Sequence, residues 1–148
     1  MKKILLRSGS AEKTKQIGRL IGKHLLTGAT VTLRGELGSG KTTLIKGIVR
    51  GLGASSEKIV SSPTFVLIHE YKINGLKKQV YHIDWYRLRS VQGEDAALAE
   101  ECFSSGAITL VEWPERGQSL IPSNALAIRI SHLGIHSRNI QVCFPVLR

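Results

Sequence analysis

The sequence of 148 residues lacks the features that mark several classes of protein. Its two cysteines, Cys102 and Cys143, suggest neither a disulfide framework nor a metal-binding pair, so a reducing, cytoplasmic environment is expected. No apolar run approaches the ~18 residues that a membrane-spanning helix needs. The first residues are charged and hold only three consecutive apolar side chains, so we expect no signal peptide. Repeats and linkers are also absent, which indicates a single domain over residues 1–148.

Acidic residues are scarce. The chain has 11 of them against 21 lysines and arginines, a formal net charge of +10. This balance favours an anionic partner, nucleic acid among them. An acidic protein partner would satisfy the same charge. The sequence contains no RNA-binding motif, so the positive charge is the only indication of direct contact with RNA, and that contact stays open.

One segment predicts a phosphate-binding loop. Residues 35–42, GELGSGKT, fit the P-loop pattern GxxxxGK[ST] without a mismatch. An apolar run precedes them and a helix-like run follows, which is the setting that a P-loop requires. The glycines let backbone N–H groups surround a phosphate chain, and the start of the helix adds its dipole. Lys41 is expected to reach the β- and γ-phosphates, and the Thr42 hydroxyl to bind Mg²⁺.

Hydrophobic periodicity predicts helices over residues 11–26, 41–52 and 94–102, and strands over residues 29–34, 107–113, 125–132 and 139–146. The dipeptide Asn74-Gly75 predicts a type I′ turn between strands 65–73 and 76–83. The expected fold is α/β: a three-layer, P-loop NTPase-like mixed sheet with antiparallel hairpins, flanked by helices. In the first helix, Ser8 or Ser10 is the expected cap, Leu20 is expected on the apolar face, and Gly28 follows its end. Gly51 and Gly53 are expected to close the second helix.

Two carboxylates follow predicted strands. Glu112 comes after four apolar residues, a pattern that places an acid beside the P-loop to support Mg²⁺ or the attacking water. Asp84 ends the second arm of the hairpin and is a candidate for the same work. A strand-end cap or an ion pair with Arg87 explains Asp84 equally well. Thr64, in a proline-containing loop, is a candidate switch residue, although an ordinary loop fits the same pattern.

Four segments in this order resemble the TsaE (YjeE) family of small bacterial P-loop ATPases. They are GELGSGKTTL (35–44), SPTF (62–65), HIDWYRL (82–88) and EWPE (112–115). The resemblance covers nearly the whole chain. Two positions depart mildly, because family members often have Asp and Ala where this chain has Glu36 and Ser39. The segment 93–106 is hard to match, so no role is transferred to it.

The resemblance implies a function in forming N6-threonylcarbamoyladenosine at position 37 of tRNAs that decode ANN codons. It implies TsaD and TsaB as protein partners, ATP and Mg²⁺ as cofactors, and hydrolysis that is slow until the partners dock. The implied catalytic residues are Lys41, Thr43, Asp84 and Glu112. The implied metal residues are Thr42 and Glu112. The implied nucleotide-binding residues are Ser10, Thr14, Glu36, Leu37, Gly38, Ser39, Gly40, Lys41, Thr42 and Thr43. Trp113 is implied to lie beside the site and Thr64 in a switch-like loop.

Three other functions are compatible with a P-loop. A small P-loop kinase would need a second substrate pocket and a helical lid, and the hairpin at Asn74-Gly75 occupies that region of the chain. A GTPase is disfavoured because no Asn-Lys-x-Asp motif occurs. A non-catalytic, nucleotide-gated binding module would not need Asp84 and Glu112. The sequence does not indicate an arginine that would act in cis as an arginine finger on the phosphates. The chain is expected to be a monomer or to self-associate weakly.

Overall fold

The computed structural model describes residues 2–60, 67–75 and 79–146. The strands are β1 (Lys2–Ser8), β2 (Thr30–Arg34), β3 (Ile68–Tyr71), β4 (Val80–Asp84), β5 (Ile108–Glu112), β6 (Leu126–His132) and β7 (Arg138–Phe144). The α-helices are α1 (Ala11–His24), α2 (Lys41–Gly51) and α3 (Gly93–Ser104). Two 3-10 helices are η1 (Glu57–Ile59) and η2 (Pro114–Leu120). No described helix is long and apolar enough to cross a membrane.

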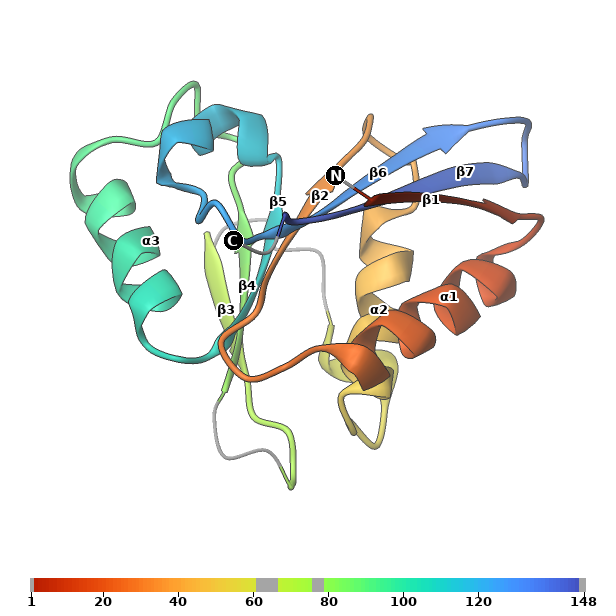
Figure 1. Cartoon of the computed structure of the whole chain (residues 1–148), viewed down its shortest axis with the longest axis horizontal. Coiled ribbons are helices and arrows are strands. Elements are labelled where there is room, and N and C mark those ends of the chain that lie inside the picture. Colours follow the sequence, from red (N-terminus) through yellow and green to blue (C-terminus); the bar gives the residue numbers. More distant parts are fainter. Residues whose placement is uncertain (1, 61–66, 76–78, 147–148) are drawn as a thin grey trace.

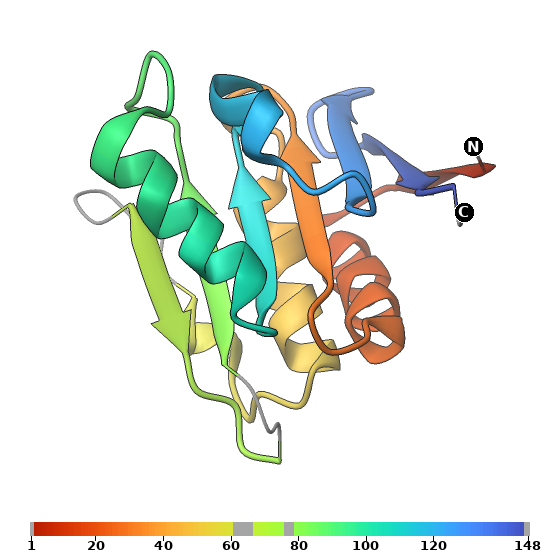
Figure 2. The same ribbon diagram turned by 60° about the vertical axis from the view of Figure 1, so that its left-hand side comes forward.

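The strands form one mixed sheet in the order β1-β7-β6-β2-β5-β4-β3. Figure 1 and Figure 2 show α1 and α2 on one face of this sheet and α3 on the other. A core cluster lies on each side, the larger one built on α1, α2 and the sheet, and the smaller one on α3 and the sheet. The prediction of a three-layer α/β fold is therefore confirmed.

The centre of the sheet is parallel and fully covered. Strand β5 pairs in parallel with β2 on one side and with β4 on the other. All five residues of β5 are buried, because helices cover both faces there. The parallel register brings the carboxyl ends of these strands to one edge of the sheet, where Asp84 lies opposite Glu112.

Helices α1 and α2 contact each other through their backbones. A side chain at Gly18 would lie 2.4 Å from the Leu44 carbonyl oxygen, and one at Gly47 would lie 2.3 Å from the Lys15 carbonyl oxygen. Gly22 and Gly51 make the same kind of contact one turn later. Gly51 is thus a packing residue. It is also the last residue of α2, and Gly53 has a positive φ of 113° just beyond the helix, so the predicted end of α2 at these glycines is confirmed.

The predicted apolar face of α1 is wrong at one position. Leu20 is 59% exposed, because the glycines and Ile17 face α2 instead. The helix ends at His24, before the predicted end, and Leu25 is its C-cap. Ser10 is the N-cap, since its hydroxyl accepts a hydrogen bond from Lys13 N–H.

Two further differences concern strands. Strand β1 had no counterpart in the prediction, and it pairs with β7 at one end of the sheet. The predicted type I′ turn is wrong: Gly75 has a positive φ of 88°, but Asn74 does not. Tyr71 pairs with Val80, so the connection between β3 and β4 runs from residue 72 to residue 79. Local turn propensity therefore located the reversal of the chain but not its register.

Candidate nucleotide-binding site

The P-loop joins β2 to α2 in a conformation that depends on glycine. Gly38 and Gly40 have φ values of 75° and 108°, in the left-handed region where other residues are strained. A side chain at Gly35 would lie 2.7 Å from the Ile130 carbonyl oxygen. The loop ends at Gly40, the N-cap of α2, so the unpaired N–H groups of the first turn open toward the loop. This is the geometry that binds phosphate at the start of a helix.

Lys41, the first residue of α2, lies back over the loop. Its Nζ donates to the carbonyl oxygens of Gly35 at 2.5 Å and Glu36 at 2.9 Å, and lies 4.7 Å from the Trp113 ring centroid. Burial lowers the pKa of the Lys41 ammonium, while nearby carboxylates, chiefly that of Glu112, oppose this shift. The ammonium is thus held by two neutral carbonyls and a ring face, partners that an anionic ligand can replace at low cost.

The two candidate carboxylates share a cavity with the P-loop. The cavity has a volume of about 330 Å³. Its lining residues are Leu37, Gly38, Gly40, Lys41, Thr42, Thr43, Asp84, Tyr86, Arg87, Glu112 and Trp113. The folded chain therefore brings together all four residues proposed as catalytic and both proposed as metal-binding. It also brings in Arg87, so an arginine does line the cavity, contrary to what the sequence suggested.

Asp84 and Glu112 differ in their surroundings. Asp84 is half-buried, and its Oδ1 accepts a hydrogen bond of 2.9 Å from Tyr86 N–H. Burial, more than the repulsion from Glu112, raises the pKa of the Asp84 carboxyl above its ordinary value. Glu112 is only 3% exposed, and its Oε2 lies 2.8 Å from Nε2 of the fully buried His82.

A hydrogen-bonded chain behind Glu112 crosses three strands. Because a carboxylate only accepts, His82 Nε2–H donates to Glu112. The other ring nitrogen, Nδ1, lies 2.8 Å from the Tyr71 hydroxyl, which donates to it in the neutral imidazole. Burial raises the pKa of Tyr71 to about 12, so its proton is retained at neutral pH. This Tyr71–His82–Glu112 chain holds the Glu112 carboxylate in one orientation.

Trp113 covers the opposite wall of the cavity. Among the described residues it is the only non-glycine with a positive φ, 58°. Its ring lies 5.0 Å from that of Tyr86, centroid to centroid, in a tilted arrangement. A bulky residue in the left-handed region is strained and persists only where its surroundings fix it. Here Lys41, Tyr86 and the start of η2 fix Trp113 beside the P-loop.

The remaining sequence-predicted residues lie outside this cavity. Glu36 and Ser39 line a neighbouring pocket on the β6 side of the P-loop. Ser10 caps α1, and the buried Thr14 shares a hydrogen bond of 2.7 Å with Ser8. Their roles toward the nucleotide stay predictions. Thr64 lies outside the described residues.

The residues present fit a magnesium nucleotide. No group of three His, Cys, Asp or Glu side chains that could hold a metal ion occurs among residues 2–60, 67–75 and 79–146. Mg²⁺ in phosphate-transfer sites needs less, since it takes one or two carboxylates together with a hydroxyl and the substrate phosphates. Thr42, Asp84 and Glu112 offer these oxygens around one cavity. Within the P-loop itself, the buried Ser39 Oγ has no hydrogen-bond partner among described residues.

Sequence reasoning missed two residues that support the site. His82 is separated from Glu112 by thirty positions, and only the pairing of β4 with β5 brings them together. Arg138, at the start of β7, donates from Nε to the Ser39 carbonyl oxygen at 2.9 Å and so braces the P-loop from outside. The alternation of His82 with Asp84 was a signal for the first residue. Nothing in the sequence around Arg138 indicated its contact with the P-loop.

Comparison with known proteins gave consistent matches. A family model described as "Threonylcarbamoyl adenosine biosynthesis protein TsaE" matches residues 8–140. A protein of that name from Bacillus subtilis is 39% identical over 95% of this chain and 85% of its own length. One from Treponema pallidum is 36% identical over 91% and 96%, respectively. The crystal structure of Bacillus subtilis YdiB superimposes with a TM-score of 0.78 at 32% identity, over 98% of this chain and 87% of that one.

Proposed function

Because the chain belongs to the TsaE family of threonylcarbamoyl adenosine biosynthesis proteins, we propose that it binds and hydrolyses ATP. The hydrolysis would serve N6-threonylcarbamoyladenosine modification of ANN-decoding tRNAs in the cytoplasm. One observation carries the proposal: Asp84 and Glu112 end adjacent parallel strands and line one cavity with Lys41 and Thr42. A module that only bound nucleotide would not need two carboxylates there.

The P-loop residues would bind the triphosphate. The N–H groups around Gly38 and Gly40 surround the phosphates, and Lys41 exchanges its two carbonyl partners for phosphate oxygens. That exchange moves a buried ammonium from neutral acceptors to an anion, so it favours binding. Thr43 also lines the cavity, and its hydroxyl is available to the phosphates.

Thr42 and Glu112 would hold Mg²⁺ with the nucleotide. When bound, Mg²⁺ neutralises charge that develops on the phosphates in the transition state. Glu112 suits this role because His82 fixes its orientation and satisfies one of its oxygens. Asp84 is left to orient the attacking water, and a carboxyl whose pKa is raised by burial is a better proton acceptor than an ordinary one. Hydrolysis would then proceed by positioning and electrostatic stabilisation, without a covalent intermediate.

TsaD and TsaB are the proposed partners, and their docking would accelerate hydrolysis. The cavity wall on the solvent side is open, and residues from a partner would complete it and exclude water. Since Arg87 lines the cavity, the expectation of slow hydrolysis by the isolated chain no longer follows from a missing arginine. It rests on the family and on this open wall.

Turnover measured with and without TsaD and TsaB tests the proposal. We expect slow release of phosphate by the chain alone and a rate higher by at least about tenfold with the partners, a change of 1.4 kcal/mol in the barrier. Multiple-turnover modification of tRNA should require the chain. Equal rates with and without the partners would contradict partner stimulation. Binding of ATP with no release of phosphate in either assay would favour the non-catalytic module.

A further inference from the structure

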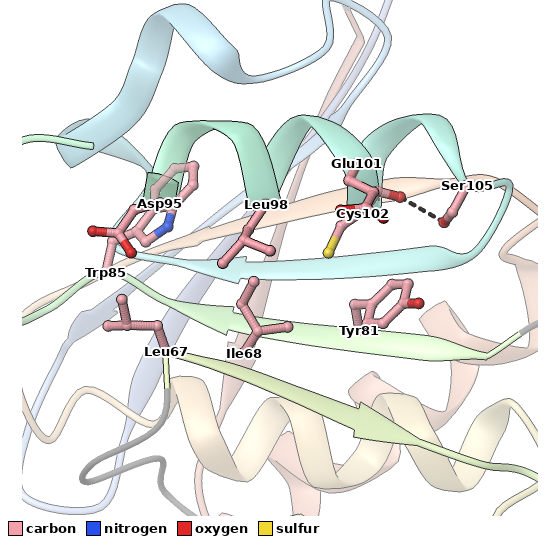
Figure 3. A pocket seen from close by; sticks show the side chains of 9 residues that line it. All are labelled: Leu67, Ile68, Tyr81, Trp85, Asp95, Leu98, Glu101, Cys102 and Ser105. Atoms are coloured by element: carbon pink, nitrogen blue, oxygen red, sulfur yellow. Dashed lines mark hydrogen bonds between the residues drawn. The ribbon is translucent and has the colours of Figure 1, made fainter. Parts of the chain in front are cut away.

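A groove lies between α3 and strand β3, on the sheet face opposite α2. Its volume is about 610 Å³, larger than the nucleotide cavity. Figure 3 shows side chains of α3 pointing down toward those of β3 and β4. The lining residues are Leu67, Ile68, Tyr81, Trp85, Asp95, Leu98, Glu101, Cys102 and Ser105.

The floor and roof of the groove are apolar. Ile68 enters from β3, Leu67 from the residue before it, and Leu98, which is 47% exposed, from the facing side of α3. These side chains pack only partly against the α3 core. An apolar side chain placed between them would remove this surface from water, which is favourable by about 25 cal/mol per Å².

Strand β3 is the edge of the sheet and has a free backbone side. The N–H of Asp84 donates to the Leu67 carbonyl oxygen at 2.9 Å, so these two residues form a hydrogen-bonded pair. In an antiparallel ladder such pairs alternate with unbonded pairs. The pairs Ile68–Ile83 and Glu70–Tyr81 are therefore unbonded. The N–H and C=O groups of Ile68 and Glu70 point away from β4, toward the edge, where no described strand pairs with them.

The rim of the groove is acidic, although the chain carries +10. Helix α3 contains four carboxylates and no lysine or arginine. Two of them, Asp95 and Glu101, line the groove, and no described lining residue is cationic. Glu70 also adds negative charge at the groove. The pKa of the Cys102 thiol, which lines the groove, is raised by burial and then by the carboxylates of Glu101 and Glu70.

We propose that this groove binds an extended, basic segment of a partner protein. The segment adds a strand to β3 by bonding to the backbones of Ile68 and Glu70, and it places one apolar side chain beside Leu98. Its lysines or arginines lie beside Glu70, Asp95 and Glu101. RNA does not fit this surface, because the carboxylates would repel its phosphates.

The groove adjoins the nucleotide cavity through β4. Trp85 lines the groove, whereas its neighbours Asp84 and Tyr86 line the cavity. The groove therefore ends against the buried Trp85, which lies in the chain between two residues that face the nucleotide. Binding to the groove itself requires no hydrolysis, so it is testable even if the proposed ATPase activity fails.

Two fluorescein-labelled peptides test the proposal by anisotropy, without nucleotide. They are Lys-Val-Lys-Leu-Lys-Val-Lys and its counterpart with glutamate in place of lysine. We expect the basic peptide to bind at least about tenfold tighter than the acidic one. Glu101→Lys and Leu98→Arg should each weaken its binding about tenfold. Leu20→Arg, which changes an exposed leucine on α1, is the matched control and should bind like the wild type.

Glu70→Pro tests strand addition directly. Its N–H points away from β4, so proline removes a donor to the peptide but no bond of the β3–β4 ladder. Binding should be lost while the circular dichroism spectrum is kept. If this variant unfolds, protection of the Ile68 and Glu70 amides from hydrogen exchange by the peptide gives the same answer in the wild type.

Three results of the peptide experiments would overturn the proposal. They are equal binding of the two peptides, unchanged binding by the groove variants, and unprotected Ile68 and Glu70 amides in the complex. A concentration-dependent dimer in sedimentation that Glu70→Pro abolishes would also overturn it, because a second copy of this chain would then occupy the groove.

Discussion

Strands β4 and β5 end side by side in carboxylates, yet the two strand ends differ in what surrounds those groups. At the end of β5, Glu112 is buried and His82 fixes its orientation. At the end of β4, Asp84 is half-buried, and burial raises its pKa although Lys41 and His82 act in the opposite direction. Neighbouring positions in one sheet thus give two acids suited to different work. His82 holds one of them in a fixed orientation, and the other is exposed enough for water to reach it.

Removing the charge at the end of β5 is expected to have the largest effect. Glu112→Gln keeps the shape of the side chain but not the charge that would hold Mg²⁺. We expect kcat for ATP hydrolysis to fall about 10³-fold, the upper range for loss of one electrostatic contact to a transition state. The measurement is steady-state phosphate release. Glu115→Gln, the same change at an exposed neighbour, is the control. A comparable loss in the control would mean that local charge, not Glu112, matters.

The same change at the end of β4 is expected to cost less. Asp84→Asn removes a water-orienting acceptor but leaves the metal-binding groups, so we expect kcat to fall about 10²-fold, in the range for general-base catalysis. The KM for ATP should stay close to that of the wild type. A large rise in KM with an unchanged kcat would assign Asp84 to nucleotide binding and remove the distinction between the two strand ends.

The support behind Glu112 gives a smaller and more specific effect. His82→Leu removes the donor to the Glu112 carboxylate, and we expect kcat to fall by about tenfold, as loss of an outer-shell partner commonly does. His82→Gln retains an N–H at a similar reach and should recover most of this loss. Magnesium titration should show weaker Mg²⁺ activation for His82→Leu than for His82→Gln. If both variants are equally impaired, His82 serves the packing of the core and not the orientation of Glu112.

The smallest expected effect is on stability. Because the folded state raises the pKa of Asp84, it favours the protonated carboxyl. This contribution to stability is fully present below the ordinary carboxyl pKa and is lost as pH rises through the raised value. Without nucleotide, the free energy of unfolding of the wild type should therefore fall relative to that of Asp84→Asn as the pH rises above the ordinary carboxyl pKa, about 4. Urea unfolding across this range measures it. Parallel curves for the two proteins would contradict the assigned cause.

Some of this site could be predicted from the sequence because its signals are local. The P-loop depends on glycines at fixed spacing, and Glu112 directly follows a buried strand, so each is visible in a short window. The Tyr71–His82–Glu112 chain is different, since it requires the register of three strands at once. The hairpin register was mispredicted for a related reason. Asn74-Gly75 indicates a turn, but the pairing of Tyr71 with Val80 is set by burial on the sheet.

The closest part of the contact between α1 and α2 escaped prediction because periodicity counts apolar side chains, and at that point the helices meet through glycines. Leu20 fits the expected stripe, yet glycines one turn apart form the interface. Because glycine has no side chain, a contact made through glycine backbones does not appear in a hydrophobic pattern. Leu20 was therefore predicted to be buried, and Gly18, Gly22 and Gly47 were given no part in the packing.

That interface also affects how variation in this family should be interpreted. Positions 18, 22, 47 and 51 admit no Cβ atom without displacing a backbone carbonyl of the facing helix. A saturation library selected for growth should therefore deplete every substitution at these four glycines as severely as at Gly40 in the P-loop. An alignment would rank both sets as equally invariant, although only one set faces the nucleotide cavity. Invariant glycines between α1 and α2 would reflect the close approach of the two backbones. Catalytic and binding roles therefore have to be inferred from the polar residues.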